Sequence, residues 1–232
     1  SIITATMSAP HWKDVTIPLT VTGTATIDTD YSTALSSKGP LTIAGGNGSG
    51  SGLSQLWRPQ GIHVDASGSI YIIDSGNDRV VKWEPGASEG VVVAGGNGAG
   101  ASLSQLAGPT GIDVDSSGNI YVADTGNKRI VKWVSGESQG TIVAGGYALE
   151  NEPNDTVTGF YNLYKVRVDS SGNLIILDSG NHRVVKWEPG ANSGTVVAGG
   201  NGQGNGLDRL SNPQNFNIDN LGNIYIADWG NS

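Results

Sequence analysis

The stretch PTGIDVDSSGNIYVADTGNKRIVKW, residues 109–133, decides the fold. It contains three short runs rich in β-branched and aromatic residues, GIDVD (111–115), IYVAD (120–124) and RIVKW (129–133), and a fourth run, TIVAGG (141–146), follows. Gly, Asp, Asn or Ser residues bound every run, which is the pattern of short strands joined by tight turns. No segment of the chain places apolar residues at helical spacing over three turns. This part of the chain is therefore predicted to form four β-strands and no helix.

The same pattern recurs along the chain. The tripeptide AGG recurs at intervals of 50, 50 and 54 residues, and a DSGN-like turn recurs at intervals of 50, 54 and 50 residues. Repeats of about 40 to 50 residues have the length of a four-stranded β-propeller blade. We therefore predict an all-β protein with three full four-stranded repeats and a partial fourth. The tripeptides begin at Ala44, Ala94, Ala144 and Ala198, and the turns begin at Asp74, Asp124, Asp178 and Asp228.

The turns between the strands also repeat. In DSSGN (115–119) and DTGN (124–127), the Asp can hydrogen-bond the turn backbone, and Gly or Asn can adopt positive φ at little steric cost. The Arg after each DTGN-like turn lies one strand position from the Asp, so an ion pair is expected. Because every repeat needs the same hairpins, whereas a catalytic group is needed once, we interpret these residues as scaffold. The set comprises Asp74, Asn77, Arg79, Asp124, Asn127, Arg129, Asp178, Asn181 and Arg183.

The repeated strings resemble a known family. Residues 109–133 and the string PQGIHVDASGSIYIIDSGNDRVVKW (59–83) are similar to the NHL repeat, whose members fold as β-propellers, commonly with six blades. The resemblance covers residues 41–232 and implies an NHL-repeat β-propeller. The third repeat departs from the pattern, because YALENEPNDTVTGFYNLYKVRVD (147–169) replaces the usual entry and is four residues longer. The loop that it forms is expected to be specific to that repeat.

Residues 1–40 lie outside the repeat period and are expected to form an N-terminal β segment. The stretch DVTIPLTVTGTATIDTDYS (14–32) begins with alternating apolar and polar residues, as in a half-buried strand. It resembles the central part of a Calx-β domain, a sandwich module of which some members bind calcium. That resemblance makes Asp28 and Asp30 candidate calcium ligands, since calcium prefers hard oxygen ligands. The alternative interpretation is a solvated acidic turn.

The two ends of the repeat region predict an incomplete ring. PLTIAGG (40–46) would supply a free outer strand, and FNID with IYIAD would supply two inner strands after the third repeat. Together they make a fourth blade that lacks one strand, which predicts either a piece of a longer propeller or a ring of four blades that closes imperfectly, and we favour the former. A part-ring would expose the apolar faces of its terminal blades, which predicts self-association.

Composition excludes several classes of partner. The net charge of −8 and the pI near 4.7 disfavour nucleic acid and anionic lipid surfaces, and no basic patch offsets them. The chain has no cysteine, so it can form neither a disulfide nor a thiolate metal site. No run of about 18 to 20 apolar residues is present, and membrane insertion is not expected.

Positions that differ among the repeats are the candidates for function. The middle residue of GIxVD and its equivalents is His63, Asp113, Arg167 and Asn217 in turn. This strand is expected to lie nearest the propeller axis, where the four polar groups could bind a small polar ligand or an ion. The alternative is a solvated position that tolerates any polar residue.

The aromatic residues divide into two groups. Trp83, Trp133 and Trp187 end the third strand of each repeat and are expected to pack against a neighbouring repeat. Trp57 and Trp229 are not repeated and are candidates for exposed binding aromatics. The glycine-rich segment 44–52 is interpreted as a flexible connection between blades, because it lacks the Lys-Ser/Thr ending of a phosphate loop.

The NHL resemblance also implies an enzymatic alternative. Some relatives are lyases that use a metal held by histidines from different blades, and a catalytic zinc needs three protein ligands. The chain offers His11, His63 and His182, and His182 occupies a turn position that favours the surface.

Two sequons, NGS at Asn47 and NDT at Asn154, lie in predicted loops and are candidate glycosylation sites. We therefore predict a non-catalytic extracellular or cell-surface module. It would bind protein or glycan through its loops, or assemble through its blade edges, and it needs no cofactor other than the calcium that Asp28 and Asp30 suggest. The alternative is a metal-dependent lyase of the NHL-propeller type, with its remaining site residues expected outside residues 1–232.

Overall fold

The computed structural model describes residues 3–4, 20–21, 42–146, 159–219 and 221–231. The chain divides into two compact units, Ser1–Thr42 and Ile43–Ser232. In the first unit β1 (Ile3–Thr4) pairs with β2 (Thr20–Val21) in antiparallel orientation, with Ile3 opposite Val21. A Calx-β fold is not shown. Asp28 and Asp30 lie outside the described residues, so the calcium site stays a prediction.

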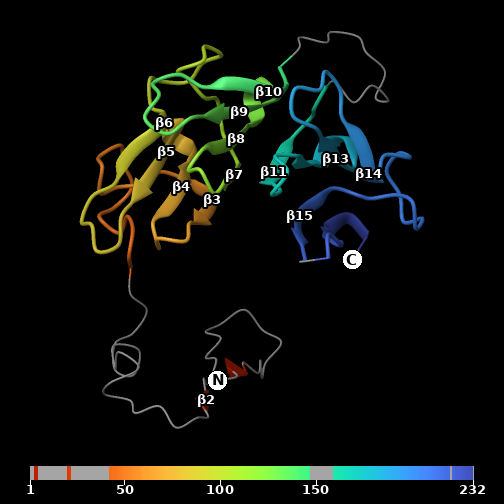
Figure 1. Cartoon of the computed structure of the whole chain (residues 1–232), viewed down its shortest axis with the longest axis horizontal. Coiled ribbons are helices and arrows are strands. Elements are labelled where there is room, and N and C mark those ends of the chain that lie inside the picture. Colours follow the sequence, from red (N-terminus) through yellow and green to blue (C-terminus); the bar gives the residue numbers. More distant parts are fainter. Residues whose placement is uncertain (1–2, 5–19, 22–41, 147–158, 220, 232) are drawn as a thin grey trace. The chain divides into compact units, whose positions relative to one another are not determined.

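The second unit contains three four-stranded antiparallel sheets, and each corresponds to one sequence repeat (Figure 1). Within every sheet the strands follow chain order, so each strand pairs with the one before it through a hairpin. We call these sheets blades A, B and C. Blade A comprises β3 (Pro59–Val64), β4 (Ile70–Asp74), β5 (Arg79–Trp83) and β6 (Val91–Gly95). Blade B comprises β7 (Gly111–Val114), β8 (Ile120–Asp124), β9 (Arg129–Trp133) and β10 (Thr141–Gly145). Blade C comprises β11 (Leu163–Val168), β12 (Leu174–Asp178), β13 (Arg183–Trp187) and β14 (Thr195–Gly199).

A fourth sheet, blade D, has two strands, β15 (Pro213–Ile218) and β16 (Ile224–Asp228), as the sequence predicted for its inner half. The free outer strand expected over residues 40–46 was wrong for its described part, because residues 42–46 form no strand. A strand at that place would need a third strand of blade D as its partner, and a lone strand has no ladder to join. Ala44 instead packs beside the cluster of Ile70, Ile72, Val81 and Trp83.

The core lies between neighbouring blades. One cluster joins Ile73 and Val80 of blade A to Val122 and Trp133 of blade B, and a second joins Ile130 of blade B to blade C. Trp133 and Trp187 lie in the clusters that join neighbouring blades, as predicted, whereas Trp83 packs within blade A and against Ala44 and Leu56 of the loop before it. The first strands of successive blades also contact one another, β3 with β7, β7 with β11 and β11 with β15. Blades that meet along their first strands form a β-propeller, so the predicted fold class is confirmed.

Glycine allows the first strands to approach closely. A Cβ on Gly111 would lie 2.7 Å from the carbonyl oxygen of Tyr164 and 2.8 Å from Cα of Lys165. Both are backbone atoms of β11, which cannot rotate away as a side chain could. The close backbone packing of β7 against β11 therefore requires glycine at position 111.

The repeated Asp, Asn and Arg form one structure, which we call the clamp. In blade B the carboxylate of Asp124 accepts hydrogen bonds from Arg129 Nε at 2.7 Å, from Asn127 Nδ2 at 2.8 Å and from the backbone N–H of Ala107 at 2.8 Å. The arginine and asparagine then donate to carbonyl oxygens of the loop that enters the blade. The acceptors are Gly100, Ala101, Ser102 and Gln105, at 2.7 to 3.1 Å. The clamp thus fastens the glycine-rich loop to the blade.

The clamp recurs around the second unit. Asp74 accepts from the backbone N–H of Trp57, Asp178 from that of Tyr161 and Asp228 from that of Ser211, at 2.6 to 2.8 Å. Arg79 and Arg183 pair with their aspartates at 2.7 and 2.8 Å, and Asn77 and Asn181 donate to the same carboxylates. All nine predicted scaffold residues therefore lie in clamps. The glycine-rich segment 44–52, which was expected to be a flexible connection, is a loop whose backbone carbonyl oxygens accept hydrogen bonds from the clamp.

The backbone of the DTGN-like turns differs from the expectation. The residues after the Asp form a short 3₁₀ turn, and positive φ falls on the fifth residue, at Asp78, Lys128 and His182, with values of 50° to 54°. Gly126 is needed for a different reason, because a Cβ there would lie 2.7 Å from the carbonyl oxygen of Ala107. The DSSGN turns agree with the expectation, since Gly118 has a φ of 79°.

The residue with positive φ connects neighbouring blades. The Asp78 carboxylate accepts a hydrogen bond from the backbone N–H of Gly108 at 2.8 Å, and His182 Nδ1 accepts one from that of Asn212 at 3.1 Å. Gly108 and Asn212 belong to the loops that enter the next blade. These contacts, which we call interblade staples, connect the turn of blade A to the loop before blade B and the turn of blade C to the loop before blade D.

We predict that Asp124→Asn lowers the free energy of unfolding by about 3–5 kcal/mol, because it leaves the buried Arg129 guanidinium without its counter-charge. Urea unfolding followed by tryptophan fluorescence measures the change. The control Asp208→Asn makes the same substitution at an exposed loop residue and is expected to change stability by less than about 0.5 kcal/mol. Equal effects of the two variants would contradict a structural role for the clamp.

Candidate ligand site at the propeller axis

His63, Asp113, Arg167 and Asn217 occupy the same register on the first strands of the four blades. Each is paired with the residue one position after the start of the second strand, as His63 is with Tyr71 and Asp113 with Tyr121. Because the first strands of successive blades contact one another, these four positions form one layer along the axis. Their placement follows from the repeat, and their chemistry is particular to each blade.

Asp113 is the centre of this layer. Its side chain is buried, with the residue only 3% exposed, and its Oδ1 accepts the Nδ1–H of His63 from blade A at 2.8 Å. Its Oδ2 accepts the backbone N–H of Val168 at 2.8 Å and faces Nε of Arg167, both in blade C, at 3.4 Å. Because a carboxylate only accepts, the proton of His63 lies on Nδ1, and Nε2 is left with its lone pair in the neutral ring. The structure thus brings together three of the four predicted residues, from three blades.

Asn217 does not join the Asp113 network. Its Oδ1 accepts the backbone N–H of Ile218 at 3.0 Å. It instead lines a hollow of about 600 Å³ that also takes in Arg167. The lining residues of the hollow are Lys165, Arg167, Asn215, Phe216, Asn217, Tyr225, Ile226 and Ala227.

Lys165 is a site residue that the sequence prediction missed. Its Nζ donates to Asn215 Oδ1 and to the carbonyl oxygen of Phe216, both at 2.7 Å, and lies 5.4 Å from the centroid of the Phe216 ring. Burial lowers the pKa of Lys165 below its usual value, and the nearby charge of Arg167 lowers it further, whereas Asp113 raises it. The signal was present in the sequence, because Lys165 and Asn215 stand where the other two repeats have Gly61 and Gly111.

The remaining candidate residues lie elsewhere. Asn47 is exposed in the loop before β3, whereas Asn154 lies outside the described residues, so glycosylation at both stays a prediction. Trp57 and Trp229 are exposed, and nothing tests whether they bind a partner. His182 belongs to an interblade staple and not to the axial layer. His11 lies outside the described residues.

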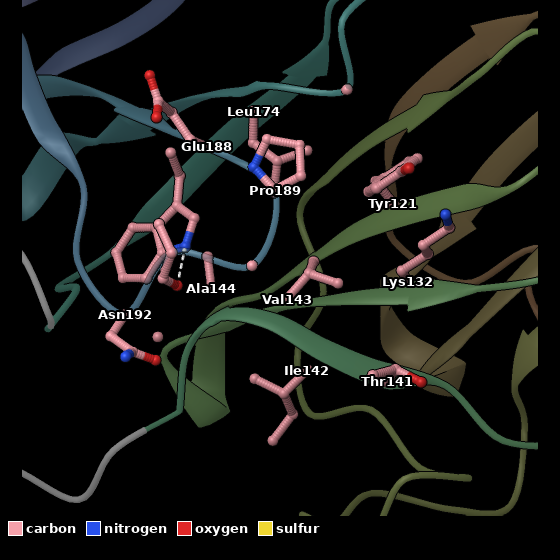
Figure 2. A pocket seen from close by; sticks show the side chains of 15 residues that line it. Tyr121, Lys132, Thr141, Ile142, Val143, Ala144, Leu174, Glu188, Pro189 and Asn192 are labelled. Carbon is pink, nitrogen blue, oxygen red and sulfur yellow. Dashed lines mark hydrogen bonds between the residues drawn. The ribbon is translucent and has the colours of Figure 1, made fainter.

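A second hollow, of about 410 Å³, lies between blades B and C. Figure 2 shows Glu188 and Pro189 of blade C on one side and Val143, Tyr121 and Lys132 of blade B on the other. The Trp187 indole N–H donates to the carbonyl oxygen of Ala191 at 3.0 Å across its floor. Because Tyr121, Ala144, Leu174 and Trp187 also belong to the packed core between the blades, we interpret this groove as the outer end of a packing seam.

The described residues contain no group of three or more His, Cys, Asp or Glu side chains that could hold a metal ion. Among the same residues there is no helix with the length and apolar character needed to cross a membrane.

Comparison with protein families supports the repeat assignment. The sequence profile of the NHL repeat matches residues 106–133 and residues 160–187. These two segments are NHL repeats. They cover the inner three strands of blades B and C, together with Ala107 and Tyr161, whose backbone N–H groups donate to the clamp aspartates. No curated protein sequence matches the chain significantly.

Solved structures show the same fold. An auxiliary nutrient binding protein from Bacteroides thetaiotaomicron superimposes with a TM-score of 0.59 at 16% identity, over 77% of this chain and 47% of that chain. A chain of a nidogen/laminin complex gives 0.55 at 23% identity, over 75% and 57%. A gluconolactonase from Xanthomonas campestris gives 0.53 at 14% identity, over 72% and 53%. The chain spans about half the length of these structures, and at such identities the likeness shows the fold alone.

We predict that Arg167→Gln raises the pKa of Lys165 toward the usual value of a lysine, because it removes a positive charge that disfavours the ammonium form. Titration of the lysine side-chain carbon signals by NMR measures the shift. Arg209→Gln removes the same charge from an exposed loop and is expected to leave the pKa of Lys165 unchanged. An unchanged or lower pKa in Arg167→Gln would show that the two cations do not share a site.

Proposed function

We propose that the chain is a non-catalytic recognition module that binds a protein or glycan partner through the axial layer and the loops around it. The observation that carries this proposal is the burial of Asp113 between groups from three blades. Burying a carboxylate costs free energy unless donors surround it. The propeller fold does not demand that cost, since blades A and D have His63 and Asn217 at the same register. Asp113 is therefore best explained by what it holds in place, the side chains of His63 and Arg167.

The structural relatives are consistent with a binding role and leave room for an enzyme. One is a nutrient binding protein and another is a chain of a nidogen/laminin complex, while a third is a gluconolactonase. A shared fold does not transfer a function, so the argument rests on the site. An extracellular or cell-surface location is part of the proposal, and the exposed sequon at Asn47 supports it.

Self-association through the terminal blades is a related proposal. In blade B, Ile112 packs between blades and is 5% exposed, whereas the equivalent Ile62 of blade A is 63% exposed. On blade D, Tyr225 is 60% exposed, whereas the equivalent Tyr121 is buried in a seam. Uncovered faces of this kind are the surfaces on which a further blade or a second chain would pack.

We predict that the double variant Asp113→Ala, Arg167→Ala loses affinity for the partner by at least about tenfold, since truncating an arginine at the centre of a binding site commonly costs about 2 kcal/mol or more. Arrays of glycans and extracellular proteins, probed with the labelled chain, would identify the partner, and surface plasmon resonance would measure the affinity. Asp208→Ala, Arg209→Ala removes the same two residue types from an exposed loop and serves as the control. Undiminished binding by the axial variant, once its fold is verified by circular dichroism, would remove the axial site.

A metal-dependent lyase is the second candidate, and one observation favours it. Histidines that bind metals commonly donate their other ring N–H to a carboxylate, as His63 does to Asp113. A catalytic zinc site needs three protein ligands, and the described residues supply a single axial histidine. These residues therefore do not form the site by themselves, and we derive no reaction step through a metal.

Metal analysis separates the two candidates. We expect the purified chain to contain less than about a tenth of an equivalent of zinc, because one axial histidine is too few ligands for tight binding. Inductively coupled plasma mass spectrometry measures the content. Zinc that is present in a fixed ratio and is lost in His63→Ala would favour the enzyme and overturn the recognition proposal.

A further inference from the structure

We propose that the hollow beside Arg167 binds a sugar acid, a hydroxylated carboxylate of monosaccharide size, with the carboxylate on the Arg167 guanidinium. This inference rests on the proposed recognition function and names the ligand chemistry of the same axial site.

The charge of the hollow is opposite to that of the chain. The chain carries a net charge of −8, yet the residues that line the hollow include two cations, Lys165 and Arg167, and no carboxylate. Two carboxylates lie beside the hollow: Asp113, which is buried and contacts His63, Val168 and Arg167, and Asp219, which accepts the hydroxyl of Tyr225. A hollow lined with one sign of charge concentrates ligands of the opposite sign. The ligand is therefore expected to be an anion.

Arg167 is arranged to bind a planar anion. The contact with Asp113 uses Nε, at 3.4 Å, and the side chain remains 43% exposed. A guanidinium has five N–H donors, so the four η hydrogens remain, and within the described part of the chain no acceptor engages them. A carboxylate matches two such donors in a bidentate geometry. Asp113 thus orients the guanidinium without using the edge that a ligand needs.

Lys165 attracts an anion through its positive charge rather than through a direct hydrogen bond. Its ammonium is tied to Asn215 and to the carbonyl oxygen of Phe216, which fixes it at the wall of the hollow. A partly buried charge acts through a lower dielectric than an exposed one, so it attracts an anion more strongly. Two fixed cations, at alternate positions of β11, therefore favour a carboxylate over a neutral group.

The rest of the lining suits a hydroxylated ring. The side-chain amides of Asn215 and Asn217 offer donors and acceptors of the kind that recognise hydroxyl groups. The hollow, of about 600 Å³, is wide open to solvent and has room for a monosaccharide. A simple carboxylate such as acetate would leave these groups unused.

The test compares D-glucuronate, D-glucose and acetate by isothermal titration calorimetry with the whole chain. We expect glucuronate to bind at least about tenfold more tightly than glucose or acetate, because it alone has both the carboxylate and the hydroxyls. Arg167→Gln should weaken glucuronate by at least about tenfold and leave the weak glucose signal unchanged. Arg209→Gln, the matched control, should bind glucuronate as the native chain does. Circular dichroism verifies that each variant is folded.

The outcomes separate this inference from the proposed function. Equal binding of glucuronate and glucose, or glucuronate binding that survives Arg167→Gln, overturns the sugar-acid inference. If the arrays then still yield a partner whose binding depends on Asp113 and Arg167, the recognition function stands with a different ligand. No binding of any of the three compounds also overturns the inference, whereas Arg167-dependent binding of glucuronate alone supports it.

Discussion

The carboxylate at the end of each second strand is the group on which the second unit depends. In blades A, B and C it is buried, and it is shared by an arginine, an asparagine and the backbone N–H of the entering loop. Through the arginine it also fixes the loop carbonyls, which would otherwise need other partners away from water. The turn that carries this group then positions the next blade through the residue with positive φ, as Asp78 does through Gly108. One turn therefore holds both the loop that enters its own blade and, in blades A and C, the loop that enters the next blade.

Much of this architecture could be read from the sequence, because it repeats. Strand positions, the buried tryptophans and the two-stranded fourth sheet follow from periodicity and from the position of β-branched residues. Two features could not be read in the same way. Positive φ in the DTGN-like turns falls on Asp78, Lys128 and His182, because the 3₁₀ turn before them moves the left-handed residue one place on. The strand expected at 40–46 has no ladder to join, which depends on pairing and not on local preference.

Lys165 shows what a repeat-based prediction overlooks. A repeat is recognised by the residues that recur, whereas the axial layer consists of residues that differ at the middle position of the GIxVD motif. The position two residues earlier differs among the repeats as well, and it holds Gly61, Gly111, Lys165 and Asn215. Where glycine is present, the first strands pack backbone to backbone. Where it is replaced, a hydrogen-bonded Lys–Asn pair lines the axis, and the hollow begins there.

The clamps and the axial layer share no side chain. Asp124, Asn127 and Arg129 contact the loop over residues 100–107, whereas Asp113 contacts His63, Arg167 and Val168. The residues that stabilise the blades and the residues of the proposed binding site are therefore separate positions within one repeat of about fifty residues. Because of this division, evolution or protein engineering can change the proposed ligand specificity of the axial layer by exchanging whole blades. The residues that make consecutive blades fit together stay the same.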